Sequence, residues 1–168
     1  MKGDADVVRH LNAVLTNELT AVNQYFLHAR MFQHWGFYRL GKIVYDESIE
    51  EMRHADMLTQ RILFLDGLPN LQDLHKLSIG ETVREALTAD LALEQKSRAT
   101  LVEGVTLAEA HKDYVSRDLM QHILKDTEDH LDYLETQVEL IDLIGEPNYL
   151  QSAVGGLDEN KSPASSGD

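Results

Sequence analysis

The sequence predicts an all-α fold: a four-helix bundle with a long crossover between its second and third helices and a short fifth helix at the C-terminal end. Apolar residues recur at i, i+3 and i+4 from Val8 through Leu11 to Ala29, over about seven turns. No comparable period-two alternation occurs, which argues against strands. Gly and Pro stand between the long segments rather than inside them. Together these patterns indicate a bundle of long helices.

Four long helices are expected at about residues 4–34, 38–65, 82–111 and 113–144. The connections at 35–37 and 111–113 are short, so each joins two antiparallel neighbours. The segment 66–81 is long enough to cross the length of a bundle, which gives two helical hairpins joined by a crossover. Pro147 begins a fifth helix that ends at about Val154. We expect one helical domain, residues 1–154, followed by a polar and disordered tail, residues 155–168.

The chain has 168 residues, of which 43% are hydrophobic and 26% charged, as expected for one globular domain. It contains no Cys, which excludes disulfides, thiolate metal sites and cysteine nucleophiles. A formal net charge of −14 argues against nucleic acid as a partner and favours cations. No stretch reaches the roughly 18 apolar residues of a membrane span, and the N-terminus lacks the apolar run of a signal peptide. We therefore expect a cytoplasmic protein with no membrane partner.

Polar side chains interrupt the apolar stripe of each predicted long helix. Continuing the stripes turns six of them toward the core: Glu18, Glu51, His54, Glu94, Thr127 and His130. A buried carboxylate is costly unless it is paired or bound to a metal. Such groups on all four helices require a common explanation.

The two hairpins are related by a shift of 76 residues along the chain. The shift superposes three pairs of residues, Glu18 with Glu94, Glu51 with Thr127, and His54 with His130. A lone Glu facing an E-x-x-H pair, twice over, is the pattern of a dinuclear carboxylate site in a four-helix bundle, where four Glu and two His surround two metal ions. The repeat therefore predicts Glu at position 127, where the chain has Thr.

Each of these residues has a simpler explanation when it is taken alone, as a solvated carboxylate or a hydrogen-bonded core imidazole. Taken together, five of the six positions agree in residue type, stripe and spacing, which favours a metal centre. Oxygen and imidazole ligands without thiolates suit iron or manganese, and zinc is an alternative.

Longer stretches of the chain resemble the bacterioferritin family. The resemblance rests on NQYFLHAR at 23–30, RILFLDGLPNLQ at 61–72 and IGEPNYLQS at 144–152, and it covers about 150 residues. It implies a ferritin-like fold and a hollow 24-subunit cage that stores oxidised iron as mineral, with b-type haem at its two-fold interfaces.

The resemblance also assigns roles to the core residues. Glu18 and His54 correspond to the terminal ligands of one iron, Glu94 and His130 to those of the other, and Glu51 to a bridging carboxylate. The second bridge belongs at position 127, so Thr127 departs from the family pattern.

Met52 occupies the place of the family's axial haem ligand. By its spacing alone it lies off the metal stripe, in a second apolar stripe with Tyr45 and Ile49, where a Met is often simple interface filler. A two-fold axis would bring two copies of Met52 together, one thioether on each side of the haem iron.

Four further positions correspond to family sites at the surfaces of the cage. Asp46 and Glu50 resemble an iron site on the inner surface, and Asn148 and Gln151 resemble residues that line a channel at the four-fold axis. From the residues alone, all four are ordinary solvated side chains.

Thr127 leaves three carboxylates to balance two ferrous ions in a buried pocket. Asp126 is a possible replacement, because it precedes His130 by four residues and lies about 40° from it on a helical wheel, although its side chain is one carbon shorter than that of Glu. Glu128 lies about 100° off the stripe and should point away. We expect an asymmetric centre that favours the first iron.

The expected function is iron storage in a haem-binding cage, in which Fe(II) is oxidised to Fe(III) and stored as mineral. In this hypothesis Thr127 impairs the subunit's own ferroxidase centre, and its main role is haem binding in a mixed cage with a second bacterioferritin subunit. One alternative is a fully competent ferroxidase homopolymer. Another is a diiron or manganese oxidoreductase bundle unrelated to storage. A ferredoxin-like reductant is a further candidate partner.

Overall fold

The computed structural model describes residues 1–155, in which the chain forms five helices. They are α1 (Ala5–His34), α2 (Tyr38–Phe64), α3 (Val83–Ala110), α4 (Tyr114–Ile144) and α5 (Glu146–Val154). The all-α prediction is confirmed, and each predicted boundary agrees to within one residue. The tail predicted at 155–168 lies, from residue 156 on, outside the described residues.

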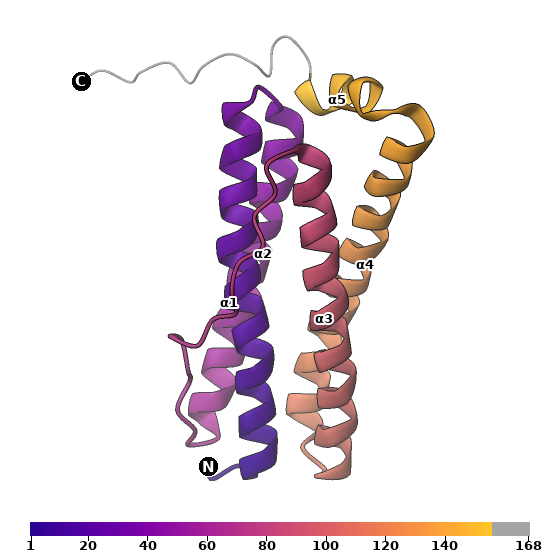
Figure 1. Cartoon of the computed structure of the whole chain (residues 1–168). Coiled ribbons are helices and arrows are strands. Elements are labelled where there is room, and N and C mark those ends of the chain that lie inside the picture. Colours follow the sequence, from indigo (N-terminus) through magenta and orange to yellow (C-terminus); the bar gives the residue numbers. More distant parts are fainter. Residues whose placement is uncertain (156–168) are drawn as a thin grey trace, which may run out of the picture.

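The long helices form two antiparallel hairpins, α1 with α2 and α3 with α4, that pack side by side (Figure 1). The crossover between α2 and α3 runs along α1 from one end of the bundle to the other, as the segment length predicts. Helix α5 lies across the end of the bundle, in contact with α2 and α4. Within residues 1–155, no helix is long and apolar enough to cross a membrane.

Local sequence signals set the ends of the helices. The Asp4 carboxylate accepts hydrogen bonds from the first backbone N–H groups of α1, Thr82 caps α3, and Asp113 caps α4. The turn after α1 and the break after α4 contain Gly36 at φ +91° and Gly145 at φ +80°, backbone conformations that favour glycine. These signals explain why short-range sequence patterns locate the boundaries well.

The crossover has no secondary structure of its own, and polar side chains of α1 bind its backbone. The side chains of Asn12, Thr20, Gln24 and His28 accept hydrogen bonds from the backbone N–H groups of residues 70, 75, 78 and 80. His28 also contacts the buried Asp90 of α3 through Nδ1 at 2.8 Å, so its ring proton is on Nδ1 and its Nε2 accepts from Gly80. This ladder of α1 side chains satisfies backbone groups that would otherwise be unpaired.

The hydrophobic core consists of two apolar clusters, one toward each end of the bundle. The first includes Leu11, Leu58, Leu101 and Ile123, and the second includes Phe32, Val44, Leu87 and Leu134. Between them lies a layer of buried polar side chains contributed by all four long helices. The fold therefore places this polar layer at mid-length, surrounded by apolar residues above and below.

Candidate metal centre

The five predicted metal ligands and Thr127, which occupies the position of the missing carboxylate, are all in the buried polar layer. Glu18, Glu51, His54, Glu94, Thr127 and His130 are each at most 7% exposed. Each of the four long helices contributes at least one of them. The structure therefore brings the predicted residues to one place, while their role as metal ligands stays a prediction.

Glu18, Glu51 and His54 form the first half-site. Nδ1 of His54 lies 3.0 Å from Glu18 Oε2 and 3.1 Å from Glu51 Oε2, and the ligand atoms of all three lie within 4.8 Å of one another. On the opposite side of the ring, His54 Nε2 is 3.2 Å from Asp126 Oδ2. Because both ring nitrogens face carboxylates, the imidazole of the metal-free protein is positioned to be protonated.

Glu94, Thr127 and His130 form the second half-site. Nδ1 of His130 lies 2.9 Å from Glu94 Oε1, and the Tyr25 hydroxyl donates a hydrogen bond to the same carboxylate. Thr127 is 2% exposed and supplies only a neutral hydroxyl. This half of the centre therefore contains one carboxylate where the first half contains two.

Glu51 connects the two half-sites. Besides its group with Glu18 and His54, its ligand atoms form a second group with Glu47 and His130, again within 4.8 Å. A carboxylate in reach of both groups has the position that the family resemblance gives to a bridging ligand. Glu51 is therefore the residue on which a dinuclear arrangement depends.

Several of the predicted metal ligands have raised pKa values, so protons compete with cations for their ligand atoms. Burial and the charge of Glu18 raise the pKa of Glu51 to about 8. Burial acts to lower the pKa of His54, but hydrogen bonds to Glu18 and Glu51 outweigh it and raise the pKa to about 11. Burial acts in the same way on His130, whose pKa is raised to about 9 by the hydrogen bond to Glu94 and the nearby acidic charges. Burial also raises the pKa of Glu94.

The donor set fits a divalent cation of intermediate hardness. It offers carboxylate oxygens and imidazole nitrogens in a buried layer, which suits iron, manganese or zinc. A cation must displace protons from these groups, so protons and metal compete for the same ligand atoms.

An open pocket of about 570 Å³ lies beside the second half-site, between α2 and α4. It is lined by carboxylates from both helices, and His130 lies in its wall. The lining includes Asp46 and Glu50, the two residues predicted at an inner-surface iron site. Asp46 is paired with Lys42 at 2.6 Å and Glu50 with Arg53 at 2.5 Å. The pocket is therefore open to solvent, predominantly acidic, and adjacent to the second half-site.

The remaining predicted residues lie away from the buried centre. Met52 is 51% exposed on α2, and Ile49, one turn earlier on the same helix, is also exposed. Asn148 and Gln151 are exposed on α5, where the Asn148 amide donates to the carbonyl of Ile144. Their haem and channel roles stay predictions.

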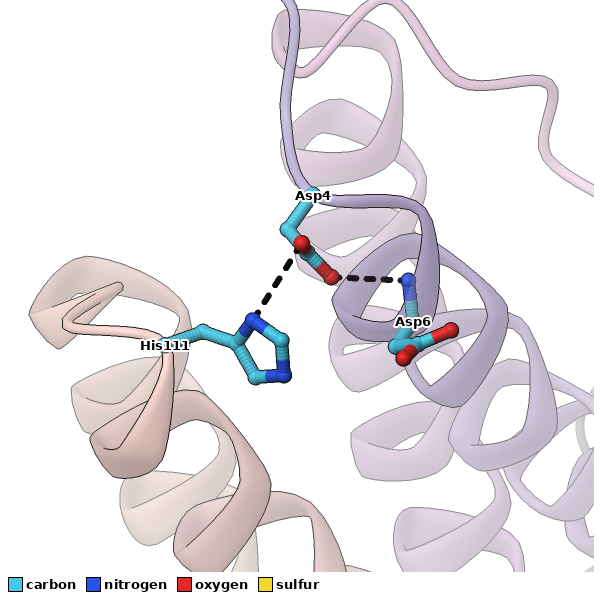
Figure 2. A group of neighbouring side chains, drawn as sticks. All are labelled: Asp4, Asp6 and His111. Atoms are coloured by element: carbon cyan, nitrogen blue, oxygen red, sulfur yellow. Dashed lines mark hydrogen bonds and ion pairs between the residues drawn. The ribbon is translucent and has the colours of Figure 1, made fainter.

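An exposed group at one end of the bundle, Asp4, Asp6 and His111, also brings three possible ligands together (Figure 2). The Asp4 carboxylate accepts the backbone N–H of Asp6 at 2.8 Å and faces His111 Nδ1 at 3.2 Å. Asp4 is thus engaged as the cap of α1 and as a link to the end of α3, which is a structural role.

Glu47, which lies beside the second half-site, is missing from the predicted set. Glu47 precedes Glu51 by four residues, so its place on the ligand face follows from helical spacing. The 76-residue repeat does not reveal Glu47, because the corresponding residue of the second hairpin is the buried Ile123 and not a carboxylate.

Comparison with known proteins identifies close relatives. The model of the ferritin-like domain family matches residues 8–144. The chain is 49% identical to a bacterioferritin of Mycobacterium bovis over 154 residues, which cover 92% of this chain and 97% of the relative. It is 47% identical to a bacterioferritin of Brucella melitensis, covering 95% and 99%. A bacterioferritin of Streptomyces coelicolor is 46% identical, covering 92% of each chain.

Metal binding should release protons at neutral pH. With pKa values of about 11, 9 and 8, His54, His130 and Glu51 are protonated at pH 7 in the metal-free protein, and they must lose those protons to bind a cation. Affinity for Zn²⁺, a redox-inert probe, should therefore rise with pH between about pH 6 and pH 8. Calorimetric titrations in buffers of different ionisation enthalpy measure the protons released. Binding without proton release would contradict these protonation states.

Proposed function

The chain belongs to the bacterioferritin family of iron-storage proteins, and we propose that it is a cage subunit whose own diiron centre is weakened at Thr127. The observation that carries this proposal is the position of Glu51, which shares one group of ligand atoms with Glu18 and His54 and another with His130. Such sharing supports two metal positions joined by one carboxylate. Family membership also implies an oligomeric cage.

In the proposed reaction, iron is both substrate and cargo. Two Fe(II) ions each lose one electron, and the electron pair reduces O2 to peroxide or peroxide to water. The Glu and His side chains exchange their protons for the incoming ions, while the Tyr25 hydroxyl holds Glu94 in place by a hydrogen bond. The acidic pocket beside His130 supports a path between the centre and the surface of the subunit.

The proposed weakness has an electrostatic cause. Glu18, Glu51 and Glu94 supply three negative charges, whereas two ferrous ions carry four positive ones. An uncompensated charge in a buried layer is costly, and a threonine hydroxyl is a poor ligand for a divalent ion. The first half-site has two carboxylates and an imidazole, so it should bind metal more tightly than the second.

Haem binding at Met52 is the second part of the proposal. The Met52 side chain is half exposed and has apolar neighbours on the same face, as an interface that covers it would require. Two copies of this face would present one Met52 thioether to each side of a haem. A bound haem would supply one-electron transfer. A subunit with a weak centre and a haem ligand would work best in a mixed cage beside a subunit with a complete centre.

Other parts of the proposal rest on family position alone. They are an iron site at Asp46 and Glu50, a channel at Asn148 and Gln151, a ferredoxin-like reductant for iron release, and a cytoplasmic location. The competing function, a fully competent ferroxidase homopolymer, has one observation in its favour, which is the carboxylate of Glu47 near His130.

The Thr127→Glu variant should oxidise Fe(II) faster than the unmodified protein, because the added carboxylate balances the second ion. We expect an increase of about tenfold or more, which corresponds to about 1.4 kcal/mol in activation free energy. Stopped-flow absorbance on pure homopolymers measures the rate. Thr136→Glu, which adds the same charge at an exposed position of α4, is the matched control and should leave the rate unchanged. A fast phase in the unmodified protein that Thr127→Glu does not improve would contradict a weakened centre.

The Met52→Ala variant should lose haem while it keeps its assembly state. Without the thioether, haem iron has no axial ligand from this face. Absorbance measures haem per subunit, and native mass spectrometry measures assembly. Met57→Ala, on the inward side of α2, is the control and should retain haem. Full haem content in Met52→Ala would rule out the assignment.

Cages isolated from the source cells should contain a second type of subunit. A weak centre is tolerated when a neighbour oxidises iron for the whole cavity. Native mass spectrometry of the intact cage, followed by release of the subunits, identifies the composition. Cages built of this chain alone would argue against a mixed assembly.

A further inference from the structure

The second half-site contains a buried hydroxyl without a partner. Thr16 and Thr20, which are buried in α1, each donate to the backbone carbonyl four residues earlier. The Thr127 hydroxyl makes no hydrogen bond within residues 1–155, although only 2% of the residue is exposed. An unpaired buried hydroxyl costs about 1–3 kcal/mol. The Thr127 hydroxyl is thus a buried polar group with no hydrogen-bond partner among the described residues.

Glu47 is the carboxylate best placed to serve this half-site. Its Oε2 lies 3.7 Å from His130 Nδ1, and its ligand atom is within 4.8 Å of those of Glu51 and His130. The 3.7 Å separation is too long for a hydrogen bond, so the carboxylate is near the imidazole without being fixed to it. Glu47 reaches the centre from α2, one turn before Glu51.

The surroundings of Glu47 leave it free to move onto a cation. Its side chain is 34% exposed and lines the pocket between α2 and α4. Within residues 1–155 it makes no hydrogen bond, and His130 is its one ion-pair partner. Apart from the His130 imidazole at 3.7 Å, no positively charged side chain within residues 1–155 pairs with this carboxylate, and a divalent ion would supply the missing charge.

The two acidic neighbours of Thr127 in sequence have other partners. Asp126, the replacement considered from helical spacing, faces Nε2 of His54 at 3.2 Å, on the outer side of the first half-site. It also lies 3.5 Å from His122. Glu128 points to the opposite surface and pairs with Arg98 of α3 at 2.8 Å. Neither supplies a carboxylate beside Glu94 and His130.

We propose that Glu47 is the missing fourth carboxylate of this chain and binds the second cation together with Glu94, His130 and Glu51. This inference rests on the proposed diiron function. It restores the charge count to four carboxylates for two divalent ions. In this arrangement the fourth carboxylate ligand comes from α2 rather than from α4. It lies in the wall of the pocket rather than in the buried layer. The second cation is therefore held, but it is bound more weakly and exchanges more readily than the first.

The test measures where and how tightly Zn²⁺ binds, independently of catalysis. The full-length assembled protein is soaked with Zn²⁺ in crystals, and anomalous scattering gives the occupancy of each half-site. Calorimetry gives the two affinities in solution. In the unmodified protein we expect Zn²⁺ in both half-sites, with a Glu47 oxygen bound to the second ion. In Glu47→Gln we expect the first ion to remain and the affinity for the second to fall by about tenfold or more.

Asp56→Asn is the matched control, because it removes one negative charge from an exposed position of the same helix. It should keep both ions. The double variant Glu47→Gln with Thr127→Glu should bind the second ion again, because the restored residue makes Glu47 unnecessary. If the double variant still lacked the second ion, the loss in Glu47→Gln would come from a disturbed half-site rather than from a removed ligand, and the assignment of Glu47 would be overturned.

The outcomes separate this inference from the function on which it rests. A single ion in the unmodified protein, bound by Glu18, Glu51 and His54, would overturn the role of Glu47. Two ions bound with unchanged affinity in Glu47→Gln would overturn it as well. The absence of any ion at Glu18, Glu51 and His54 would instead contradict the proposed metal centre itself.

Discussion

Burying a layer of carboxylates in the middle of an apolar bundle is the constraint on which the rest of this structure depends. Each buried negative charge must be balanced by a proton or a cation, because the surrounding layers offer little solvation. In the metal-free protein the balance comes from His54 beside Glu18 and Glu51, and from His130 beside Glu94. The apolar clusters at both ends hold the four helices in the register that these contacts require. The same contacts make the layer receptive to metal, since a divalent ion can replace the positive charge that the protons provide.

The two hairpins are similar in sequence but unequal in chemistry. Along α2, the positions that face the centre are Glu47 and Glu51, whereas the corresponding positions of α4 are Ile123 and Thr127. Helix α2 therefore supplies acidic groups to both half-sites, and α4 supplies mainly an imidazole. For the proposed pair of cations this distribution gives an asymmetric centre, in which the first would be enclosed by buried ligands and the second would lie next to an open acidic pocket.

Helix α2 also carries the predicted metal ligands on one face and the predicted haem ligand on another. Glu51 and His54 turn inward to the polar layer, while Met52 turns outward to an exposed apolar face. Consecutive residues on a helix differ in direction by about 100°, so one short stretch can serve a buried metal centre and a subunit interface at once. A haem held at Met52 would then lie on the far side of the helix that carries the metal ligands, which suits electron transfer between the two.

The sequence by itself determined the helices, their ends and five of the six positions of the predicted centre. These features depend on local spacing: the 3.6-residue period, caps such as Asp4 and Thr82, and the E-x-x-H pairs. Tertiary structure alone decided which side chains of different helices meet. It placed the carboxylate of Asp126 against His54 rather than in the second half-site, and it brought the carboxylate of Glu47 close to His130. Such contacts depend on how each helix is rotated and packed against its neighbours, and no repeat along a single chain records that rotation.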